Sequence, residues 1–187
     1  EVYLEVPSAQ VKSAVILMAL KNKHKSYIHE LCKTRNHTEL LLEYLGADIT
    51  CRDLTISVSG KHPLQGKDIY VPGDISSAAF FIIACLMLPG SEVLLRNCGL
   101  NPLRTGILTV LKQIGVKIEI INKRTLNNEL VGDISVKYQS NLRPFTIDKN
   151  LIPLLIDEIP ILALLATQIE GVSVISDCKE LRIKETD

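Results

Sequence analysis

An internal repeat is the feature that most constrains the fold of this chain. The first copy begins at Val6-Pro7 and passes through a helical stretch, a strand-like stretch, a second helical stretch and two short strand-like stretches. The second copy begins at Val71-Pro72 and follows the same order, so that Pro7 corresponds to Pro72 and Gly46 to Gly115. Each copy therefore predicts a β-α-β-α-β-β unit, in an α/β (α+β) fold built from repeated units.

A third, shorter copy follows near the end of the sequence. It predicts a strand at Leu154–Ile156, a helix near Ile159–Gln168, a turn at Glu170-Gly171 and a strand over VSVIS. Repeat units bury their apolar faces against neighbouring copies, and about three units are normally needed to close a core. We therefore expect these two and a half units to be a piece of a larger protein.

A polar, turn-rich segment, Gly60–Asp68, separates the first copy from the second. Composition of this kind is typical of a domain boundary. We therefore expect two domains, 1–70 and 71–187, with a hinge near 67–73.

The composition limits the classes of partner. Of the 187 residues, 47% are hydrophobic, which is enough for a real core, and the low aromatic content of 4% predicts that this core is aliphatic. Lys plus Arg equals Asp plus Glu at 21 each, so no net charge attracts nucleic acid or an anionic membrane. The longest apolar stretch, around Ile75–Leu88, is too short to span a bilayer. Together with the lack of a signal peptide, these features predict a cytoplasmic protein that binds neither nucleic acid nor membranes.

The cysteine and histidine spacings do not suggest a metal centre. The five cysteines are odd in number and widely spaced without a CxxC pair, and the four histidines also lack metal-ligand spacing. We expect reduced, buried thiols, no metal and no other cofactor.

Two helix starts are candidates for binding an anion. Ser8, Ala9 and Gln10 follow Pro7, with Lys12 one turn later, and Asp74 holds the corresponding place in the second copy. The first N–H groups of a helix and its dipole attract anions. Ordinary N-capping by Ser8 and Asp74 explains the same residues, and spacing alone favours this interpretation. The segments TRNHTE, which contains Arg35, and NPLRTG, which contains Arg104, likewise combine one cation with a capping or turn pattern.

Two acids interrupt an otherwise apolar stretch, Leu151–Ala166. A carboxylate among residues that must be buried costs several kcal/mol unless it is paired, hydrated or protonated, so Asp157 and Glu158 are candidates for a functional site. A second charged cluster at 180–187 contains Lys184 and Glu185, and one interpretation is that the two clusters converge on one polyanionic ligand. The alternative is that Asp157 and Glu158 cap a helix beginning near Ile159.

Six segments cover nearly the whole chain in a fixed order: PSAQVKSA, TRNHTELLLEYLGADI, VPGDISSAAFFIIA, NPLRTGILTVLKQIG, LIDEIPILALLA and ELRIKETD. Together they resemble the 5-enolpyruvylshikimate-3-phosphate synthase family, and SAQ and ELRIKETD resemble its glyphosate-tolerant class II branch. The resemblance implies two lobes of three units each, with substrates bound in the cleft between the lobes. It identifies 1–70 as the third unit of the first lobe and 71–187 as the first unit and a half of the second.

The resemblance also implies an activity, which is transfer of the enolpyruvyl (carboxyvinyl) group of phosphoenolpyruvate to the 5-hydroxyl of shikimate 3-phosphate, in chorismate and aromatic amino-acid biosynthesis. It implies that Asp157 is the general base and Glu185 the proton donor. The implied substrate contacts are Ser8, Ala9, Gln10, Arg35 and Lys184. Several cations of the family site have no counterpart in this chain, so we expect the 187 residues alone to be inactive.

Three alternatives remain. The UDP-N-acetylglucosamine enolpyruvyl transferases share the fold and the phosphoenolpyruvate chemistry but lack the SAQVK and RIKETD segments. RNA 3′-phosphate cyclase has a similar repeat architecture, but the balanced charge disfavours a nucleic-acid enzyme. A non-catalytic structural lobe is compatible with the incomplete third copy.

Overall fold

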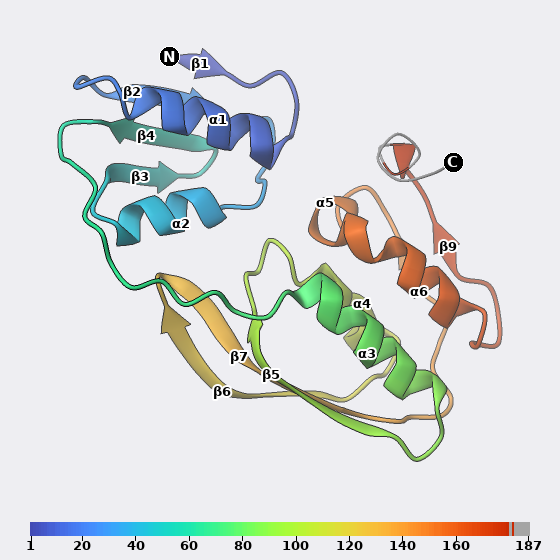
Figure 1. Ribbon diagram of the computed structural model, residues 1–187. Helices are drawn as coiled ribbons and strands as arrows, with labels where there is room; N and C mark the ends of the chain where they lie inside the picture. Colours follow the sequence, from blue (N-terminus) through green and yellow to red (C-terminus); the bar gives the residue numbers. More distant parts are fainter. Residues whose placement is uncertain (180, 182–187) are drawn as a thin grey trace. The chain divides into compact units, whose positions relative to one another are not determined.

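The computed structural model describes residues 1–179 and residue 181, and the chain divides into two packed units (Figure 1). Unit 1 consists of Glu1–Val71 and Thr125–Glu129, and unit 2 consists of Pro72–Arg124 and the residues from Leu130 onward. Assignment of the two units to particular lobes of a larger enzyme stays a prediction.

Unit 1 contains one complete copy of the predicted repeat. Its elements are β1 (Val2–Tyr3), α1 (Ala9–Ala19), β2 (Ser26–His29), α2 (His37–Tyr44), β3 (Asp48–Arg52) and β4 (Thr55–Ser59). The strands form one sheet in the order β1-β2-β4-β3, in which β1 runs parallel to β2 and the other neighbours are antiparallel. Helix α1 packs against β2 and β4, and α2 packs against β3.

Unit 2 contains the second copy and the start of a third. The second copy comprises α3 (Ile75–Met87), β5 (Glu92–Gly99), α4 (Gly106–Gln113), β6 (Ile118–Leu126) and β7 (Glu129–Lys137). The remaining elements are β8 (Thr146–Ile147), α5 (Ile152–Leu155), a 3₁₀ turn η1 (Ile156–Glu158), α6 (Ile159–Ala166) and β9 (Val174–Ile175).

Strand pairing confirms the repeat. The sheet order β5-β7-β6 in unit 2 corresponds to β2-β4-β3 in unit 1. Gly73 forms a single parallel bridge with Cys98 of β5, which is the counterpart of the parallel pairing of β1 with β2. In the third copy, β8 again pairs with β9 in parallel. The predicted fold of repeated β-α-β-α-β-β units is therefore correct.

One local prediction is wrong. The segment expected to be the first strand of the third copy, Leu154–Ile156, lies in α5 and η1, and the strand is β8 instead. Pro153 explains the difference, because proline is favoured in the first turn of a helix and a short apolar run does not by itself distinguish helix from strand. The hairpin between β6 and β7 turns at Asn127 and Asn128, with φ of 48° and 65°.

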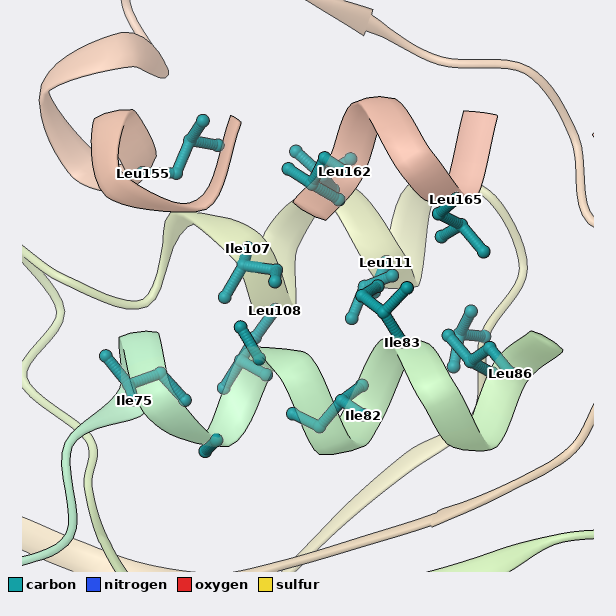
Figure 2. Close-up of a cluster of buried hydrophobic side chains, with 14 of the residues drawn as sticks. Ile75, Ile82, Ile83, Leu86, Ile107, Leu108, Leu111, Leu155, Leu162 and Leu165 are labelled. Carbon is teal, nitrogen blue, oxygen red and sulfur yellow. The ribbon is translucent and has the colours of Figure 1, made fainter. Parts of the chain in front are cut away.

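Each unit has its own aliphatic core, as the composition predicted. In unit 2, side chains of α3, α4, α5 and α6 gather in one cluster (Figure 2). Members of this cluster that are almost inaccessible to solvent include Ile82, Ile83, Ile107, Leu111, Leu155 and Leu162. The smaller core of unit 1 consists of Leu4, Ile16, Ile28, Leu42, Ile49, Ile56 and Val58. Within the described part of the chain, the helices are too short or too polar to cross a lipid bilayer.

Candidate active-site residues

The residues singled out from the sequence fall into three places. Ser8, Ala9 and Gln10 form the start of α1, and Arg35 lies in the loop between β2 and α2, so these four belong to unit 1. Asp157 lies in η1 of unit 2. Lys184 and Glu185 lie outside the described residues.

The start of α1 is capped by a neutral side chain. Ser8 has an extended backbone, and its Oγ accepts a hydrogen bond from the N–H of Val11 over 3.3 Å. The N-capping interpretation of Ser8 is therefore correct. Capping uses one of the four N–H groups that a helix cannot satisfy internally, so the positive end of the helix dipole remains available to a negatively charged ligand.

The corresponding start of α3 carries a charge. Asp74 caps this helix by accepting a hydrogen bond from the N–H of Ser77 over 3.3 Å, and its Oδ1 lies 3.0 Å from Nη2 of Arg104. The same Arg104 nitrogen donates a hydrogen bond to Oγ of Ser76 over 2.7 Å. A carboxylate at this place repels an anion, and Arg104 serves the structure, as the turn pattern around it favoured. The first turn of α1 is therefore the better candidate of the two for an anion site.

Lys12 does not act as predicted. We expected its charge to add to an anion site at the start of α1, but its side chain is fully buried. Its Nζ lies 3.0 Å from Oε1 of Glu30 and 2.7 Å from Oε1 of Glu39. This ion-pair cluster was missed because the two glutamates come from other elements. One signal was available: Lys12 and Ile16 are four residues apart and therefore share the inward face of α1.

The TRNHTE segment does not form a capping box. Asn36 is the N-cap residue of α2 and makes no side-chain capping hydrogen bond, while Glu39 is buried against Lys12. The side chain of Thr34 contacts Glu30 instead of capping α2, because its Oγ1 donates a hydrogen bond to Oε1 of Glu30 over 2.6 Å. The polar residues of this segment thus fold the loop that carries Arg35 rather than capping α2.

The two acids of the apolar stretch differ in accessibility. Asp157 is partly exposed, whereas Glu158 is 2% exposed. Helix α6 begins at Ile159 with a proline in its first turn, as predicted, but Glu158 at its N-cap position makes no side-chain capping hydrogen bond. Capping by Glu158 therefore does not account for the acid pair, and Asp157 is the more solvent-accessible of the two acids.

The cysteines only partly match the expectation of buried thiols. All five are free: Cys85 and Cys98 are buried, Cys32 and Cys178 are partly buried, and Cys51 is exposed. Burial raises the pKa of the Cys85 and Cys98 thiols, which keeps them neutral and unreactive. Among the residues that the structure describes, His, Cys, Asp and Glu side chains form no group of three or more that is arranged to hold a metal ion.

Comparison with known proteins gives one consistent family. The family model described as EPSP synthase (3-phosphoshikimate 1-carboxyvinyltransferase) matches residues 1–187. The chain is 54% identical over 183 residues to the 3-phosphoshikimate 1-carboxyvinyltransferase of Petrotoga mobilis, and the match covers 97% of this chain and 42% of the relative. It is 48% identical over 187 residues to the protein of the same name from Listeria monocytogenes, covering 100% of this chain and 44% of the relative.

Solved structures agree. The EPSP synthase of Acinetobacter baumannii superposes with a TM-score of 0.92 at 38% identity, covering 99% of this chain and 42% of that chain. The enolpyruvyl transferase NikO of Streptomyces tendae shares the fold, with a TM-score of 0.67 at 19% identity. The chain thus spans less than half the length of the relatives it matches, and it belongs to the EPSP synthase family.

Proposed function

We propose that this chain provides part of a 3-phosphoshikimate 1-carboxyvinyltransferase. The proposed reaction moves the enolpyruvyl group of phosphoenolpyruvate to the 5-hydroxyl of shikimate 3-phosphate and releases inorganic phosphate. The observation that carries this proposal is the alignment of 97–100% of this chain with proteins of that name, at 48–54% identity. The free cysteines support a reducing compartment, for which we propose the cytoplasm.

In this proposal, the start of α1 binds shikimate 3-phosphate. Ser8, Ala9 and Gln10 supply neutral donors at the positive end of a helix, where a phosphate group is favoured. Arg35 supplies a charge-assisted contact from the loop before α2. The contrast between Ser8 and Asp74 supports the assignment, because only the neutral cap leaves room for a negative ligand.

The addition step requires two proton transfers. Asp157 removes the proton of the 5-hydroxyl as its oxygen attacks C2 of phosphoenolpyruvate, and Glu185 protonates C3. Phosphate then leaves C2 of the tetrahedral intermediate while the Glu185 carboxylate takes a proton back from C3, so that the carbon–carbon double bond of the enolpyruvyl group forms again. Two carboxyl groups in opposite roles need different proton affinities, and Lys184 beside Glu185 contributes to that difference while also contacting substrate. The partly exposed place of Asp157 supports its role as the base.

A chimera tests the proposal. In it, this chain replaces the matching 42% of the Petrotoga mobilis relative, and the assay measures phosphate release and the mass of the organic product. We expect the chimera to form 5-enolpyruvylshikimate 3-phosphate. A folded chimera without turnover, beside an active parent, would overturn the proposal.

One variant of the chimera tests the binding site itself. Ser8→Asp keeps a good N-cap, since Asp and Ser cap helices about equally well, but adds a negative charge where phosphate is proposed to bind. We expect the KM for shikimate 3-phosphate to rise at least about 100-fold with little change in melting temperature, corresponding to roughly 3 kcal/mol. Ala14→Asp is the control, because it adds the same charge to an exposed position of the same helix. Equal KM values in both variants would exclude this binding site.

A further inference from the structure

We propose that Lys12 is a positioning residue for substrate binding, because its buried ammonium group fixes the loop that carries Arg35 relative to the first turn of α1. This inference rests on the proposed function, in which both of those segments bind shikimate 3-phosphate. Lys12 itself is fully buried and does not need to contact the substrate.

The ammonium group has three protons and three oxygen acceptors from three different segments. Its Nζ lies 3.0 Å from Oε1 of Glu30, directly after β2, and 2.7 Å from Oε1 of Glu39 in α2. It also donates a hydrogen bond to the main-chain oxygen of Thr34 over 3.3 Å. One side chain of α1 thus holds the end of a strand, a loop and the start of a second helix.

Thr34 is held from both sides. Its N–H and its Oγ1 donate to Oε1 of Glu30, over 3.2 and 2.6 Å, while its carbonyl oxygen accepts from Lys12. That carbonyl belongs to the peptide plane that leads into Arg35, and planarity of the peptide group transmits its orientation to the next residue. Lys12 and Glu30 together therefore set the direction in which the chain enters Arg35.

The cluster is not an efficient way to stabilise a core. Two carboxylates face one ammonium in a buried place, and Oε2 of Glu39 is buried without a hydrogen-bond partner in the described structure. Apolar residues of similar volume often serve a core as well as a buried ion pair does. A direct link between α1 and α2 also exists nearby, where the hydroxyl groups of Ser13 and Thr38 lie 2.6 Å apart. Lys12 therefore does more than join the two helices: its bond to the carbonyl oxygen of Thr34 orients the Thr34–Arg35 peptide.

The test compares two variants of the chimera described above. The variant Lys12→Met/Glu39→Gln removes the ammonium together with one carboxylate, so that the net charge of the cluster is unchanged, and circular dichroism verifies that the variant is folded before its kinetics are measured. Thr38→Val is the matched control, because it breaks the hydroxyl link between the same two helices without touching Thr34. We expect the double variant to raise the KM for shikimate 3-phosphate at least about 10-fold with kcat within about 3-fold, and the control to leave both unchanged.

Hydrogen exchange on the 187-residue chain gives a second readout that does not depend on activity. We expect the amide of Thr34 to exchange at least about 10-fold faster in the double variant, while Ile28 and Ile56 in the neighbouring sheet keep their protection. Faster exchange with an unchanged KM would overturn the inference, since the cluster would then only stabilise the loop. Unchanged exchange would overturn it as well. Lack of turnover by the unmodified chimera would instead count against the proposed function, and the exchange measurement would still decide whether Lys12 fixes the loop.

Discussion

Gly46 and Gly115 hold the same position in two consecutive repeat units, each in the left-handed backbone region after the last turn of a helix. Their φ angles are 88° and 105°. Each N–H bonds back to a carbonyl three residues earlier, in Glu43 and Lys112, over 3.0 and 3.1 Å. A residue with a Cβ is disfavoured in this conformation, so the geometry explains why glycine recurs at these two places.

Replacement of either glycine by alanine is expected to cost a similar amount. A Cβ at Gly115 would meet nothing within 4 Å, and one at Gly46 would meet only Gln65, at 3.9 Å. The cost therefore comes from the backbone alone. We expect the free energy of unfolding to fall by about 1–2 kcal/mol in each variant. Urea denaturation of the two single variants measures it.

Gly60→Ala provides a contrast in the same experiment. A Cβ at Gly60 would lie 1.8 Å from the carbonyl oxygen of Leu20, so main-chain atoms must move. We expect a larger loss than at Gly46, confined to unit 1. A loss at Gly60 equal to or smaller than that at Gly46 would contradict this assignment of causes.

The core of unit 2 predicts different effects for two leucines of α6. Leu162 belongs to the core cluster of unit 2 and is 0% exposed, whereas Leu164 is 46% exposed. We expect Leu162→Ala to lower the free energy of unfolding by about 2–5 kcal/mol through lost burial and a residual cavity. Leu164→Ala is the matched control and should change it by about 0.5 kcal/mol or less. Equal losses in calorimetric unfolding would show that α6 packs differently.

Asp133 predicts a pH dependence of stability. Its Oδ2 accepts a hydrogen bond from Nδ2 of Asn122, and its Oδ1 accepts one from the N–H of Asn97, both over 2.8 Å. These bonds, the Asn122 bond first, lower the pKa of the Asp133 carboxyl below its ordinary value. The resulting stability is present above the unfolded pKa of about 3.9 and is lost as the pH falls through the lower folded pKa.

The variant Asp133→Asn removes this contribution. We expect the urea midpoint of the unmodified chain to exceed that of the variant at pH 7, and the difference to shrink as the pH falls below about 4. Asp48 also has a lowered pKa, through its hydrogen bond from Ser59, but it is present in both proteins and cancels in the comparison. A difference that is constant from pH 7 to pH 3 would contradict the role of the carboxylate.

The features that the sequence predicted well are those with local causes. Ser8 and Asp74 cap their helices as predicted, because capping depends on residues three positions apart. The repeat could be recognised in the sequence because Gly46 and Gly115 both occupy a position with positive φ, where glycine is favoured.

The features that were missed depend on contacts between distant residues. The two-residue strands β8 and β9 pair across 28 positions of sequence, Thr146 with Val174, and are too short for an alternating pattern to reveal them. Lys12 was assigned to an anion site because its partners Glu30 and Glu39 lie in other elements and give no signal within α1. The sequence of one helix shows only that a charged residue lies on its inward face; it does not show which residues of other elements pair with that charge.

Steady-state kinetics of the chimera carrying Asp157→Asn test the central claim most directly. Because a general base acts in the transition state, we expect kcat to fall about 10²–10⁴-fold while the KM for shikimate 3-phosphate changes little. Asp148→Asn is the control, since it removes the same charge from an exposed acid of the same unit. A chimera whose kcat is unchanged by Asp157→Asn, or falls equally with Asp148→Asn, would contradict the account.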